Sequence, residues 1–74
     1  MQRALLSNCC YNLTKQLEKK SQFLWVVDNY IKDAENEGNS KCVEIFRKIK
    51  ADEEKHVEML KEEIARLSRE GKFT

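Results

Sequence analysis

The sequence predicts an all-α protein, an antiparallel hairpin of two long helices that pairs with a second copy into a four-helix bundle. Three observations lead to this prediction. The 74 residues contain no proline and only two glycines, Gly38 and Gly71. Apolar residues recur in alternating steps of three and four on both sides of Gly38, as helices require. These apolar stripes are also wider than one neighbouring helix covers, so a lone hairpin leaves part of each exposed.

The first helix is expected to cover about residues 3–37 and could be broken near Ser7-Asn8, where helix propensity is weak. Cys9, Phe23 and Tyr30 flank one side of its inward stripe, and Trp25 and Val26 flank the other. The stripe itself consists of Leu6, Cys10, Leu13, Leu17, Lys20, Leu24, Val27, Ile31 and Ala34.

A turn at residues 38–40 is expected to separate the helices. Gly38 favours a helix stop, and Asn39 or Ser40 favours the cap of the next helix. The second helix then covers about residues 41–70 and ends before Gly71. Residues 1–74 therefore form one hairpin domain. The second inward stripe is widened by Ile45, Met59 and Ile64, and consists of Cys42, Phe46, Ile49, Glu53, His56, Leu60, Glu63 and Leu67.

The composition excludes several classes of protein. The 14 basic and 13 acidic residues are balanced, whereas a nucleic-acid-binding surface needs a basic excess or patch. No apolar run approaches the roughly 20 residues of a membrane span, and the amino terminus does not resemble a secretory signal. We therefore expect a cytoplasmic protein that binds neither nucleic acid nor membrane.

The three cysteines, Cys9, Cys10 and Cys42, do not form a disulfide framework or a zinc site. Their number is odd, and the C-x-x-C pairs of a zinc site are missing. A chain that folds back at Gly38 places Cys42 several helical turns from the other two, beyond the reach of a disulfide. We expect reduced, buried thiols, with a disulfide between two copies as the alternative.

Four positions on the inward stripes are polar: Lys20, Glu53, His56 and Glu63. A charge that faces a core is costly unless it is paired or binds a metal. Glu63 lies near the end of its helix, where solvent reaches it. Glu53 and His56 form Glu-x-x-His and project from one face, the spacing with which bundle proteins hold two metals.

The segment around this motif resembles the metal-binding helix of ferritin-like and rubrerythrin-like proteins. The shared features are the apolar-Phe pair at Ile45-Phe46, the acidic run 52–54 and the Glu-x-x-His of Glu53 and His56. Gly38 falls where such hairpins turn, and the resemblance covers roughly residues 18–67. It implies a homodimer or larger homo-oligomer that binds two irons, or manganese or zinc, and acts as a ferroxidase or peroxide scavenger.

The first helix leaves two alternatives open. The family pattern requires a metal-binding Glu about one hairpin upstream of Glu53, and a gap-free match places Lys20 there. Glu18 has a spacing that a longer turn would allow, which gives Glu18, Glu53 and His56 as the metal ligands. If Lys20 faces inward instead, its ammonium replaces the metal and pairs with Glu53. The protein is then a non-catalytic structural or protein-interaction bundle without a cofactor.

Overall fold

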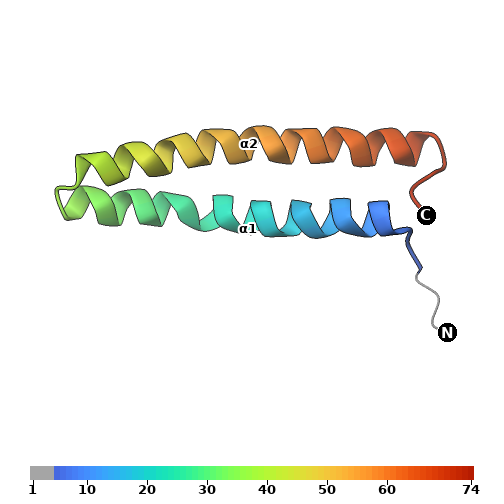
Figure 1. Ribbon diagram of the computed structural model, residues 1–74, viewed down its shortest axis with the longest axis horizontal. Coiled ribbons are helices and arrows are strands. Elements are labelled where there is room, and N and C mark those ends of the chain that lie inside the picture. Colours follow the sequence, from blue (N-terminus) through green and yellow to red (C-terminus); the bar gives the residue numbers. More distant parts are fainter. Residues whose placement is uncertain (1–4) are drawn as a thin grey trace.

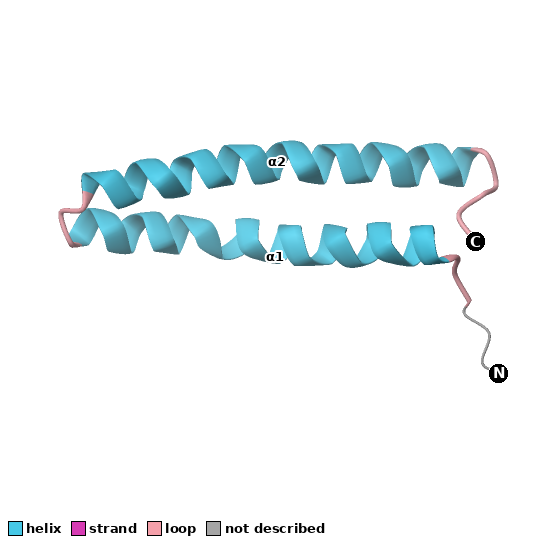
Figure 2. Ribbon diagram, viewed as in Figure 1, coloured by secondary structure: helices cyan, strands magenta, loops and turns pink. Residues whose placement is uncertain are grey.

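The computed structural model describes residues 5–74 and confirms an all-α hairpin. Helix α1 spans Asn8–Asn36 and helix α2 spans Ser40–Arg69, and the described residues contain no strand. The two helices run antiparallel, side by side, with loop only at the turn and at the two ends (Figures 1 and 2). The chain measures 52 × 28 × 14 Å, so it is a single flat layer of two helices.

Helix α1 begins at Asn8 because Ser7 caps it. The Ser7 hydroxyl accepts a hydrogen bond from the backbone N–H of Cys10 at 3.2 Å, which satisfies one of the unpaired donors of the first turn. The expected start near residue 3 falls partly on residues 1–4, outside the described part of the chain. Residues 5–7 are not helical. The low helix propensity at Ser7-Asn8 therefore coincides with the start of α1.

The turn combines a glycine stop with an asparagine cap. Gly38 has a φ of +69°, and the backbone N–H groups of Gly38 and Asn39 donate to the carbonyls of Glu35 and Ala34. This is the Schellman pattern, which needs a left-handed residue. The Asn39 side chain then accepts from the backbone N–H of Cys42 at 2.9 Å and starts α2. Of the two expected caps, Asn39 is therefore the one used.

A second Schellman turn at Gly71 sends the end of the chain back toward the start of α1 (Figure 1). The main-chain oxygen of Thr74 accepts from the backbone N–H of Ser7 at 2.6 Å. The Cys10 thiol donates to the carbonyl of Lys72 at 3.6 Å. The tail thus covers Cys10, which is buried although it lies one turn from the helix end.

The core of the single hairpin is small. Among the described residues only Cys10, Val27, Ile31 and Ala34 are buried, and none of these belongs to α2. The large hydrophobic side chains that remain exposed are Leu5, Tyr11, Trp25, Tyr30, Ile45, Ile49 and Met59. Two helices alone therefore leave much of their apolar surface in solvent.

One broad side of the layer is apolar. We call it the apolar face and define it by Phe23, Tyr30, Ile45, Ile49 and Met59. Tyr30 contacts Phe23 with ring centroids 6.2 Å apart, and its ring centroid lies 5.5 Å from that of Phe46 in α2. Tyr30 is nonetheless exposed. An open groove of about 370 Å³ on this face lies between the helices and is lined by Leu13, Gln16, Lys20, His56, Met59, Leu60 and Glu63.

The opposite side, which we call the polar face, carries ion pairs between the helices. Lys50 Nζ lies 2.9 Å from an Asp28 carboxylate oxygen, and Arg47 Nη2 lies 3.3 Å from one of Glu35. Arg47 follows Phe46 in the sequence, and Lys50 follows Ile49. One position along a helix is a rotation of about 100°, so these two basic side chains point away from the apolar residues before them. The hairpin is therefore amphipathic across its two broad sides.

Candidate functional site

Three side chains meet at the middle of the apolar face. Glu53 Oε1 lies 3.1 Å from Lys20 Nζ and 2.8 Å from His56 Nδ1. One carboxylate oxygen therefore joins an ammonium from α1 to an imidazole one turn further along α2. We call Lys20, Glu53 and His56 the polar cluster.

The helical register explains why these three residues meet. Glu53 lies seven residues from both Phe46 and Leu60, so it occupies the same line of α2 as these half-buried apolar residues. Lys20 occupies the equivalent line of α1 between Leu13 and Val27. The side chain of Glu53 is only 17% exposed and that of Lys20 27%, whereas His56 is 49% exposed. The charged pair is thus partly desolvated, and His56 lies at its open edge.

The hydrogen bond from His56 lowers the pKa of Glu53, and the Lys20 ammonium lowers it further, while partial burial opposes both. Glu53 is therefore an acceptor at neutral pH. A neutral His56 then carries its proton on Nδ1, because that nitrogen faces the carboxylate. Its Nε2 keeps a lone pair, which is the form of imidazole that binds metals.

The sequence also predicted Glu18 as a ligand, and within one copy the structure places it away from the polar cluster. Glu18 is exposed and lies beside Tyr11, Thr14 and Lys15 on another side of α1. The structure therefore brings Glu53 and His56 together with Lys20, and not with Glu18. Across residues 5–74 no three His, Cys, Asp or Glu side chains gather as a metal site would require.

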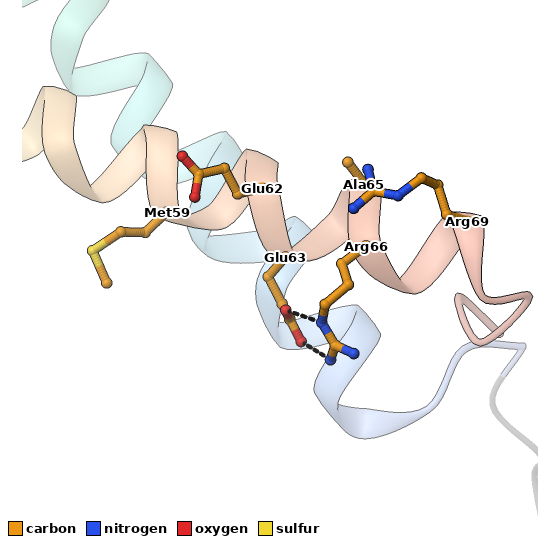
Figure 3. Close-up of a pocket in the computed structure, with 6 residues that line it drawn as sticks. All are labelled: Met59, Glu62, Glu63, Ala65, Arg66 and Arg69. Atoms are coloured by element: carbon orange, nitrogen blue, oxygen red, sulfur yellow. Dashed lines mark hydrogen bonds and ion pairs between the residues drawn. The ribbon is translucent and has the colours of Figure 1, made fainter.

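Glu63, the fourth inward polar residue, pairs within α2. Both of its carboxylate oxygens accept from Arg66, from Nε at 2.8 Å and from Nη2 at 2.7 Å (Figure 3). This pair lowers the pKa of Glu63 and raises that of Arg66. Arg66 was not singled out from the sequence, although a Glu-x-x-Arg spacing signals such a pair.

The ammonium of Lys20 stands where a cation would contact Glu53. A metal that used Glu53 Oε1 would therefore have to displace both Lys20 and His56 from that oxygen. The chain offers two adjacent ligand types in Glu53 and His56, but the third group of the polar cluster is a donor that cannot bind a metal while it is protonated. As it stands, the arrangement is a hydrogen-bonded ion pair.

No family model, curated protein or solved structure matches the chain. In the part of the chain that the structure describes, neither helix is both long and apolar enough to cross a membrane.

Proposed function

We propose that the hairpin is a structural module that assembles with a second copy, apolar face to apolar face, into a four-helix bundle. The proposal is based on the solvent-accessible area of a single hairpin. The hairpin exposes 6005 Å². A compact monomer of its mass, 8.8 kDa, exposes only about 4,800 Å² by the usual scaling. A single copy therefore keeps far more surface in water than a stable monomer of this size.

The same scaling indicates how much a second copy would cover. A compact protein of twice this mass exposes about 7,900 Å², whereas two separate hairpins expose about 12,000 Å². The difference of about 4,000 Å² lies within the range of obligate homodimers, about 2,000 to 5,000 Å². The exposed Tyr30, Ile49 and Met59 side chains lie on the face where this burial would occur.

The polar cluster favours a non-catalytic bundle. Lys20 occupies the position that the ferritin-like pattern assigns to a metal-binding carboxylate, and its ammonium is 3.1 Å from Glu53. A protein cation thus balances the partly buried carboxylate, which then needs no metal for that purpose.

A second candidate function is metal binding in a ferritin-like dimer, with iron, manganese or zinc held by Glu53 and His56 of both copies. One observation favours it. His56 lies on the exposed apolar face, so a second copy that packs there would bring two Glu-x-x-His motifs toward each other. Glu18 would be the further ligand, which requires α1 to rotate about its axis, because Glu18 lies on another side of that helix than Lys20. Ferroxidase or peroxide-scavenging activity would follow only from such a site.

Sedimentation equilibrium over a range of micromolar concentrations tests the assembly. We expect a dimer, and a folded monomer at all concentrations would refute the module. Melting temperatures with ferrous iron, manganese or zinc separate the two candidates at neutral pH, with His56→Ala as the control. If the Lys20–Glu53 ion pair takes the place of a metal, none of these ions should change the melting temperature. A shift of several degrees that His56→Ala removes would establish the metal site instead, since saturation at about 100 times the dissociation constant adds about 2.7 kcal/mol.

A further inference from the structure

We infer that the polar cluster sets the register and the choice of partner when two hairpins assemble, by requiring the cluster of one copy to meet the cluster of the other. This inference rests on the proposed bundle and goes beyond it. It assigns Lys20 and Glu53 a role in recognition between copies rather than only within one chain. The partner is a second copy of this chain.

The polar cluster lies at a central position along the hairpin. Lys20 is the thirteenth of the 29 residues in α1, and Glu53 is the fourteenth of the 30 in α2. The cluster therefore lies near the midpoint of both helices. Two copies related by a twofold axis then bring their clusters to the same level, whether their turns lie at the same end or at opposite ends.

A slipped register between the two copies would bury the polar cluster against apolar side chains. Displacement by seven residues, about 10.5 Å along the helix, would keep the same helix faces in contact. It would place the Lys20–Glu53 level of one copy against the level of Val27 and Phe46 in the other, or against that of Leu13 and Leu60 if the displacement is in the opposite direction. Charged groups would then be sealed under apolar side chains, which is strongly unfavourable. The aligned register instead joins two ammoniums and two carboxylates, whose formal charges cancel.

The rest of the apolar face discriminates little between registers. Phe23, Tyr30, Ile45 and Ile49 lie on the turn side of the cluster and Met59 lies on its other side. These side chains carry no charge that would favour one register over another. A polar layer inside an apolar interface is the known way in which helical assemblies fix register, at some cost in stability. The polar cluster is the only such layer at the centre of this face in the described residues.

A charge-exchange experiment tests the inference directly. Lys20→Glu and Glu53→Lys each destroy the pair within the chain, and each would bring four like charges together in a homodimer. Mixing the two variants, one of them labelled with ¹⁵N, brings the two carboxylates of one copy against the two ammoniums of the other only if the clusters meet. Native mass spectrometry and sedimentation should then give a heterodimer that binds about tenfold or more tightly than either homodimer.

The polar face supplies the matched control. Glu35→Arg and Arg47→Glu exchange a pair that also joins the two helices, at 3.3 Å. Their mixture should give the statistical ratio of homodimers and heterodimer, because this pair does not face the partner.

The results of the mixing experiments distinguish failure of the register inference from failure of the bundle. Preferential heterodimers from the Lys20 and Glu53 variants support the inference, and so does recovery of helical circular dichroism on mixing if neither variant folds alone. A wild-type dimer whose variants mix statistically, or whose variants stay unfolded when mixed, overturns the inference and leaves the bundle standing. A monomeric wild type overturns both.

Discussion

At the scale of single residues, the ion pair between Lys20 and Glu53 makes the hairpin sensitive to loss of either charge alone. Lys20→Met removes the ammonium and leaves a carboxylate that is only 17% exposed. We expect a loss of about 1–3 kcal/mol in the free energy of unfolding. Adding Glu53→Leu should restore much of it, because two apolar groups replace the pair. Urea unfolding followed by circular dichroism measures both, and a double variant no more stable than Lys20→Met would contradict the expectation.

Glu53 should also make the free energy of unfolding depend on pH. Its pKa in the folded chain is held below the ordinary value of roughly 4.3, chiefly by the hydrogen bond from His56. The stabilisation is therefore complete above roughly pH 5 and is lost as the pH falls through the lowered pKa. Wild type should exceed Glu53→Gln by about 1 kcal/mol at pH 7 and by less at pH 3. Urea midpoints at the two pH values decide it, since an equal difference at both would exclude Glu53 as the source.

The candidate site illustrates what residue patterns can and cannot provide. Spacing alone places Glu53 and His56 on one face of α2, because residues three apart are neighbours on any helix. It also places Lys20 on the inward line of α1. The distance of 3.1 Å between Lys20 and Glu53 depends on how the two helices face each other, which is a tertiary property. The ligand role of Glu18 stays a prediction, because it depends on a second copy.

At the scale of elements, the turn depends on the left-handed backbone of Gly38. Apart from Gly38 itself and its two chain neighbours, no heavy atom lies within 4 Å of where a Cβ would be, so a substitution there meets strain of the backbone alone. Gly38→Ala should cost about 1–2 kcal/mol, the usual cost of a left-handed residue with a side chain. Gly38→Asn should cost less, since asparagine tolerates this conformation. Thermal unfolding of the two variants provides the comparison, and an alanine variant as stable as wild type would contradict the role of Gly38.

The hairpin itself is predictable because its signals are local. The absence of proline, the apolar periodicity and Gly38 each act within a few residues, and the all-α hairpin follows from them. The start of α1 is less predictable. Helix propensity allowed a helix from about residue 3, but Ser7 is the N-cap and α1 begins at Asn8. The carboxyl-terminal residue Thr74 also contacts Ser7 at this point. The contact of Thr74 with Ser7 joins the two ends of the chain, and no local pattern signals it.

At the scale of the whole molecule, the two broad sides should respond differently to a new charge. Ile49→Lys places an ammonium on the apolar face and should weaken dimerisation by at least tenfold, because the lysine would be desolvated there. Trp25→Lys is the matched control. Trp25 is 87% exposed, more than Ile49 at 42%, but lies outside the apolar face. Sedimentation equilibrium measures both, and dimerisation weakened equally by the two variants would place the interface elsewhere.

The connection through a single tight turn also determines how the chain folds. The hydrogen bonds between the side chains of the two helices, and from Cys10 to the tail, join residues 12, 22, 33 and 62 positions apart, in order from the turn outward. Each contact formed nearer the turn shortens the loop that the next must close, so the helices can zip from Gly38 toward the open end. Closing the widest of these loops directly would cost about 1.5 kcal/mol more in chain entropy than closing the narrowest. We therefore expect the turn half, in which Val27, Ile31 and Ala34 are buried, to form in one chain before it meets a second copy. We expect the outer half to form last and to fray first.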